Sequence, residues 1–183
     1  TMFENKLIDN LKYQCAKLDT LRYIRVRGRI YIRKKDDSMF TEEELAVIKE
    51  GLHRCSGLES FSPALECKPD MDEINALVAA SIHDYFDPVL AKKEKVRFRV
   101  RARRSDKTFP LRSKDIEIAV ATKVEEMFGA SRLKVDLTGA EVTIGVEVRD
   151  VNAMVYYTSY NGAGGLPVGS NSPVLALLSG GID

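Results

Sequence analysis

Lys95–Lys114 reads KVRFRVRARRSDKTFPLRSK, and its first nine residues alternate between basic and apolar side chains. Successive side chains of a strand point to opposite faces of a sheet. Val96, Phe98, Val100 and Ala102 therefore lie on one expected face, and arginines fill the positions between them. This alternation predicts a strand with one buried face and one face lined by guanidinium groups.

Helices and further strands are expected on both sides of this strand. Asp70 followed by Glu73 is typical of a helix N-terminus, and the apolar spacing predicts a helix that continues through Tyr85 and stops at Pro88. Ser113 is expected to cap another helix, which Gly129 closes. Three strands should follow, at 133–137, 142–148 and 153–160. Helix, strand, helix and then strands indicate an α+β or α/β layer structure.

The first part of the chain has a different order of elements. An amphipathic helix at 2–18 is followed by a hairpin around Gly28. Thr41 and Glu44 form a capping box for a second helix that ends at Gly57, and a strand follows. This order matches a ferredoxin-like unit without its first strand. We therefore expect a truncated ferredoxin-like domain at 1–68 and a second domain at 69–160.

The last part of the chain changes composition. Residues 161–172 are rich in Gly and Pro, which predicts a linker. VLALL lacks alternation and predicts a buried strand that opens a third domain at 173–183. In the SGGID that follows, two glycines allow backbone N–H groups to converge on an anion, and Asp183 could orient a magnesium ion. By itself this short motif indicates a turn as readily as a phosphate site.

Composition excludes several classes of protein. No apolar run approaches the ~18 residues of a membrane span, and no signal peptide pattern is present, so we expect a cytoplasmic protein without a membrane partner. Cys15, Cys55 and Cys67 are widely separated and read as free thiols, with no metal site. Residues 1–170 contain no recognisable catalytic constellation.

The charge is segregated. Residues 95–114 carry a net charge of +8, whereas the whole chain carries +1 and the other 163 residues sum to −7. A row of arginines can be a solvated sheet face, or it can bind the phosphate backbone of a nucleic acid. Basic residues continue past the strand to the start of the next helix, which favours RNA. The candidate RNA-binding residues are Arg97, Arg99, Arg101, Arg103, Arg104, Lys107, Arg112 and Lys114.

Three stretches together resemble a known family. GAGGLPVGS, followed closely by VLALLSGGID, is similar to the junction between linker and PP-loop in tRNA 4-thiouridine synthetases, sulfurtransferases also tied to thiamine biosynthesis. FRVRARRSDKTFPLRSKDI resembles their THUMP domain, and MFENKL with RVRGRIYI resembles their ferredoxin-like domain. The resemblance covers nearly the whole chain. It implies an N-terminal part of a longer enzyme, ending in the first strand and loop of an ATP-pyrophosphatase domain.

The resemblance also implies a reaction at uridine 8 of tRNA. In this family ATP, with magnesium, adenylates the carbonyl oxygen, and a persulfide sulfur delivered from a cysteine desulfurase displaces AMP. We expect this chain to contribute tRNA binding and no catalytic residue, and to be inactive by itself; pairing into a homodimer stays open. The positions that match the nucleotide-binding stretch are Leu177, Leu178, Ser179, Gly180, Gly181 and Asp183.

Two other functions stay open at this point. A THUMP-containing RNA-binding adaptor, or a component of an RNA methyltransferase, would carry the same basic strand without sulfur chemistry. A PP-loop ligase or amidotransferase acting on a small molecule would carry the same terminal motif, with the arginines as a solvated face. Salt-dependent tRNA binding separates this last possibility from the other two.

Overall fold

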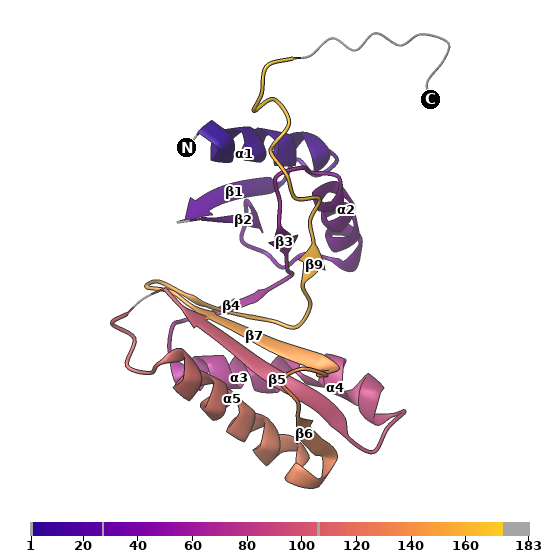
Figure 1. Ribbon diagram of the computed structural model, residues 1–183, viewed down its shortest axis with the longest axis vertical. Helices are drawn as coiled ribbons and strands as arrows, with labels where there is room; N and C mark the ends of the chain where they lie inside the picture. Colours follow the sequence, from indigo (N-terminus) through magenta and orange to yellow (C-terminus); the bar gives the residue numbers. More distant parts are fainter. Residues whose placement is uncertain (1, 27, 106, 174–183) are drawn as a thin grey trace. The chain divides into compact units, whose positions relative to one another are not determined.

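The chain divides into two compact units. The computed structural model describes residues 2–173 except 27 and 106. Residues up to Phe61 form the first unit together with those from Tyr160 onward, and Ser62–Ser159 form the second (Figure 1). The mixture of helices and strands in both units agrees with the α+β class expected from the sequence.

The second unit is a five-stranded sheet with helices on one face. The strand order is β4-β8-β7-β5-β6, with β5 parallel to both of its neighbours and the remaining pairs antiparallel. The strands are β4 (Leu65–Cys67), β5 (Val96–Arg104), β6 (Leu133–Val135), β7 (Val142–Val148) and β8 (Ala153–Tyr156). The helices are α3 (Met71–Ser81), α4 (His83–Leu90), α5 (Ser113–Phe128) and the short η1 (Ala130–Arg132).

The apolar face of β5 lies in the core of this unit. Val96 and Phe98 are fully buried and pack in one cluster with Ile74 of α3 and Ile116 of α5. The alternating residues of β5 are exposed or half-buried. The predicted strand is therefore confirmed, and its arginines lie on the face of the sheet that α3 and α5 do not cover.

Two helix boundaries of the second unit differ from those expected. The helix predicted to stop at Pro88 is split instead at Ile82, and α4 continues through Pro88 to Leu90. Phe86 is fully buried in this segment, so its packing outweighs the local penalty of proline. At the start of α5 the N-cap is Arg112, not Ser113. The carboxylate of Asp115 accepts the N–H of Arg112 at 3.1 Å, which stabilises this first turn.

The first unit has two helices and two short sheets among its described residues. They are α1 (Met2–Gln14), β1 (Leu21–Val26), β2 (Arg29–Lys34), α2 (Glu42–His53), β3 (Ser60–Phe61) and β9 (Tyr160–Asn161). β1 and β2 form the expected hairpin. The capping box is confirmed: Glu44 N–H donates to Thr41 Oγ1 at 3.2 Å, and Thr41 N–H donates to Glu44 Oε2 at 2.9 Å. α2 ends at His53, earlier than the Gly57 stop expected from the sequence.

The segments on either side of the second unit differ from their expected assignment. The sequence placed residues 62–68 in the first domain, but β4 pairs with β8 and belongs to the second unit. Residues 161–172 were expected to be a linker, but β9 pairs with β3 in the first unit. Strands of two or three residues carry too little pattern to reveal a partner about 90 to 100 residues away.

Candidate nucleic-acid interface

The uncovered face of the sheet carries the basic row. Alternation along β5 places the four arginines at odd-numbered positions on this face. Their neighbours on β7, read from the register, are Thr143, Gly145 and Glu147. The row is therefore flanked by a hydroxyl, a glycine and one carboxylate. Its four members, in chain order, are Arg97, Arg99, Arg101 and Arg103.

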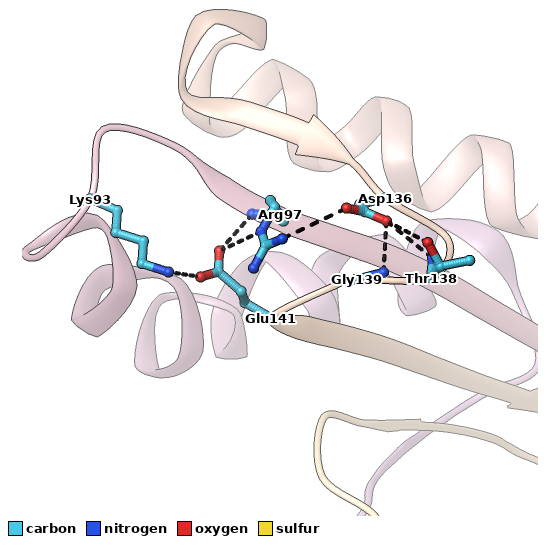
Figure 2. A network of polar contacts seen from close by, with 6 residues as sticks. All are labelled: Lys93, Arg97, Asp136, Thr138, Gly139 and Glu141. Atoms are coloured by element: carbon cyan, nitrogen blue, oxygen red, sulfur yellow. Dashed lines mark hydrogen bonds and ion pairs between the residues drawn. The ribbon is translucent and has the colours of Figure 1, made fainter.

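Arg97 is bound to carboxylates of the same unit (Figure 2). Its guanidinium lies 4.0 Å from Asp136 Oδ2 and 3.7 Å from Glu141 Oε2. Glu141 also accepts the backbone N–H of Arg97 at 3.1 Å and pairs with the ammonium of Lys93. The positive charge of Arg97 is therefore largely neutralised by the carboxylates of Asp136 and Glu141.

Both carboxylates of this network are held in the charged form. Backbone N–H groups of Gly139 and Thr138 lower the pKa of Asp136, with a smaller contribution from Arg97. The side chain of Lys93 and the N–H of Arg97 lower the pKa of Glu141. A hydrogen bond to a carboxylate favours its ionised form. At neutral pH the network thus presents two negative groups to Arg97 and Lys93.

Two further arginines are held by neutral acceptors. Arg99 donates to Thr143 Oγ1 at 3.0 Å and to the carbonyl of Leu137 at 2.8 Å. Arg104 donates to the carbonyl of Phe109 at 2.8 Å and holds the loop after β5 against the sheet. These bonds orient the guanidinium groups without removing their charge. Arg99 can still attract a phosphate, whereas Arg104 acts mainly on the loop.

The remaining basic residues fall into one unpaired set at the carboxyl end of β5. We call it the free basic set, because its side chains are exposed and have no partner among the residues that the structure describes. Lys114 differs, since its ammonium lies 3.6 Å from Glu117 Oε2. Glu147, the register neighbour of Arg103, is bound by Arg149 at 2.5 Å. The free basic set consists of Arg101, Arg103, Lys107 and Arg112.

A tyrosine on the same face was missed by the sequence reasoning. Gly145 is the register partner of both Arg101 and Tyr156, so the three lie in one row across β5, β7 and β8. A Cβ at Gly145 would lie 2.2 Å from the Tyr156 ring, which shows that the ring rests on the glycine backbone. A glycine inside a strand often marks such a close approach and was the available signal. An aromatic ring on a sheet surface can stack on a nucleotide base.

Comparison with known proteins agrees with this architecture. The family model described as THUMP domain matches residues 68–158. That range contains four of the five strands of the sheet, β5 to β8, and begins directly after β4. Residues 68–158 form a THUMP domain. The basic strand β5 and the helix α5 are thus elements of its THUMP domain.

Curated relatives extend the similarity beyond the THUMP domain. A probable tRNA sulfurtransferase of Lysinibacillus sphaericus is 33% identical over 181 residues, 99% of this chain and 42% of the relative. One from Methanocaldococcus jannaschii is 35% identical over 142 residues, 78% of this chain and 35% of the relative. The chain therefore spans less than half the length of these relatives. The resemblance drawn from the sequence is confirmed.

Solved structures support the fold. PH1313 from Pyrococcus horikoshii aligns with a TM-score of 0.74 at 28% identity, covering 92% of this chain and 53% of that one. A 4-thiouridine synthetase, solved as an RNA complex with bound ATP, aligns with a TM-score of 0.67 at 22% identity. The alignment covers 92% of this chain and 39% of the synthetase chain. At this identity the second match is evidence of the shared fold.

The cysteine thiols of the chain have raised pKa values. Burial raises the pKa of Cys15 and Cys55, and burial with nearby carboxylates raises the pKa of Cys67 to about 11. Thiols with raised pKa values are poor nucleophiles at neutral pH. The predicted nucleotide-binding residues, 177–181 and 183, lie outside the described residues. In the described part of the chain, no helix has the length and apolar character needed to cross a bilayer.

Proposed function

We propose that the THUMP domain of this chain binds tRNA through the uncovered face of its sheet. The observation that carries this proposal is the free basic set. Arg101 and Arg103 are exposed on one strand face and have no protein partner among the described residues. A guanidinium stays charged at any physiological pH and suits a phosphate oxygen in geometry.

The arginines at the carboxyl end of β5 are the favoured contacts for RNA, because those at the other end are already bound within the protein. Phosphate binding at Arg97 would compete with Asp136 and Glu141, which already lie within 4.0 Å of its guanidinium. Arg101 and Arg103 have no such internal partner to give up. Tyr156 lies in the same row as Arg101 and adds a ring for stacking. Phosphate contacts are therefore assigned to the free basic set, with Arg99 and Lys114 as weaker contributors.

For the whole protein we propose the activity of its curated relatives, the transfer of sulfur to tRNA. The resemblance extends this to 4-thiouridine at position 8, formed with ATP and magnesium bound at 177–183. A cysteine desulfurase would supply the persulfide, in the cytoplasm. This chain would contribute RNA binding, while the sulfur-carrying cysteines would lie beyond Asp183. A role in thiamine thiazole synthesis and a homodimeric state belong to the same proposal.

Equilibrium binding of the chain to fluorescent tRNA, across 50–200 mM KCl, tests the RNA part of the proposal. The logarithm of the affinity is expected to fall linearly with the logarithm of salt concentration, because each phosphate contact releases condensed counterions. A slope of about −3 to −5 is expected for four to six basic side chains that each contribute ~0.7 to 0.9. Absence of binding at 50 mM KCl would refute it.

A further inference from the structure

Residues 160–170, which composition marks as a flexible linker, are packed along the first unit. Ser60 pairs with Asn161 and Phe61 with Tyr160 in an antiparallel register, where β3 and β9 lie side by side (Figure 1). The segment therefore begins as a strand of the first unit. Its later residues stay in contact with the same unit, as the hydrogen bonds beyond β9 show.

Backbone hydrogen bonds continue past the short strand pair. Gly162 N–H donates to the carbonyl of Glu59 at 2.8 Å, and Gly164 N–H donates to that of Leu58 at 2.7 Å. In return, Gly57 N–H donates to the carbonyl of Gly164 at 2.7 Å. Further on, the side chain of Asn10 in α1 donates to the carbonyl of Val168 at 3.1 Å. The segment is thus bound at several points along its length.

The glycines in this region serve close contact. A Cβ at Gly162 would lie 2.2 Å from the carbonyl oxygen of Leu58, and one at Gly57 would lie 2.8 Å from Cγ of Pro167. Such distances leave no room for a side chain unless backbone atoms move. Pro167 is buried and contributes an apolar anchor. The glycine-rich composition of this segment is typical of a flexible linker, but here the glycines are required by close packing against the first unit.

Side chains reinforce the strand pair at its start. The rings of Phe61 and Tyr160 have centroids 5.3 Å apart, and His53 meets Phe61 edge-on at 4.9 Å. The ammonium of Lys49 lies 3.9 Å from the centroid of the Tyr160 ring, which is a cation–π contact. Aromatic pairs and cation–π contacts stabilise the position in which the chain re-enters the first unit.

We propose that residues 160–170 are a structural strap that fixes the point at which the chain returns from the THUMP domain to the first unit. The chain leaves the first unit after Phe61 and returns at its pairing partner Tyr160, so the THUMP domain is an insertion between two bonded strands. This inference goes beyond the proposed function and does not depend on tRNA binding.

Amide hydrogen exchange on the whole chain tests the strap. The amides of Gly57, Gly162 and Gly164 are expected to exchange on the order of 100-fold more slowly than those of an unstructured peptide. Gly162→Val should abolish this protection at all three, because its Cβ meets the carbonyl of Leu58, while the amides of β5 and β7 keep theirs. The tRNA affinity of this variant should not change, so failure of the strap and failure of RNA binding are distinguishable.

The matched control is Ala163→Val, which adds a similar bulk at the neighbouring exposed position. It should leave the three amides protected. If the amides of the unmodified chain exchange at the rate of an unstructured peptide, the strap does not exist, whatever the variants do. Should Gly162→Val unfold the entire first unit, Asn10→Ala offers a milder change, expected to raise exchange only around residues 168–170. Full retention of protection in Gly162→Val would also overturn the proposal.

Discussion

Replacing Arg101 and Arg103 together by glutamine is expected to weaken tRNA binding about 25- to 60-fold at 0.1 M salt. Each phosphate contact contributes ~0.7 to 0.9 to the slope of log affinity against log salt. Two lost contacts reduce the slope by about 1.4 to 1.8. We take 1 M salt as the concentration at which the electrostatic contribution of these contacts to binding vanishes. Because 0.1 M salt is tenfold lower, the logarithm of the affinity at 0.1 M is then lower by the same 1.4 to 1.8.

The same measurement on Arg97→Gln separates an RNA contact from an internal ion pair. Because Asp136 and Glu141 already lie beside its guanidinium, this change should leave the slope within about 0.3 of the original, although it removes one positive charge. Lys92→Gln with Lys123→Gln is the matched double control, since these residues lie on and beside the helices of the other face. It should also leave the slope nearly unchanged.

Fluorescence anisotropy of labelled tRNA at five or more KCl concentrations gives both the affinity and the slope. Circular dichroism of each variant confirms that the fold is retained. The reasoning is refuted if the Arg101 and Arg103 double variant binds as tightly as the unmodified chain. A change in slope for Arg97→Gln of about half that of the double variant would likewise show that total charge, and not the free basic set, determines binding.

Three further outcomes are expected. Tyr156→Leu should weaken RNA binding by about 1 to 3 kcal/mol without changing the salt slope, measured in the same titrations, because it removes stacking and no charge. Gly145→Val should lower the free energy of unfolding of the THUMP domain by about 1 to 3 kcal/mol in urea denaturation, and Tyr156→Ala should partly restore it in the double variant. Folding lowers the pKa values of Asp136 and Glu141 from their unfolded values of 3.8 and 4.5, so both groups stabilise the fold at pH values above these. This stabilisation is lost as the pH falls through the lower pKa values of the folded state. Thermal scans from pH 6 to 3 should show the loss as a falling melting temperature, and the fall should be smaller in Glu141→Gln.

Local chemistry made several elements of this fold predictable. The alternation of β5 gives both its strand conformation and its buried face, because the period of two is a property of the strand alone. The capping box of Thr41 and Glu44 involves residues three apart and needs no tertiary partner. The family resemblance also rested on contiguous stretches of sequence. Such features can be predicted from the sequence because the residues that determine them lie within a single helix or strand.

The division of the arginine row could not be read in the same way. The partners of Arg97 lie on the loop between β6 and β7, about 40 residues later in the chain, and are brought near only because β5 is parallel to both strands. Tyr156 meets Gly145 through the register of β7 and β8. The sequence identifies these side chains as candidates, but it does not show which residues lie beside them in the fold. The strap was missed for another reason, since glycines that permit close packing and glycines that permit flexibility produce the same composition.

The spacing of the basic row gives RNA a role in the stability of the domain as well as in its recognition. Alternate positions of a strand are about 6.7 Å apart, so each adjacent pair of arginines repels by roughly 0.6 kcal/mol in water before screening. Asp136 and Glu141 offset this at Arg97, but Arg101 has no carboxylate as its neighbour on β7, and Glu147, the neighbour of Arg103, is already bound by Arg149. A bound polyanion supplies the missing negative charge. The melting temperature of the THUMP domain should therefore rise with tRNA concentration, and less so in the Arg101 and Arg103 double variant, whose unbound form should itself be no less stable than the original.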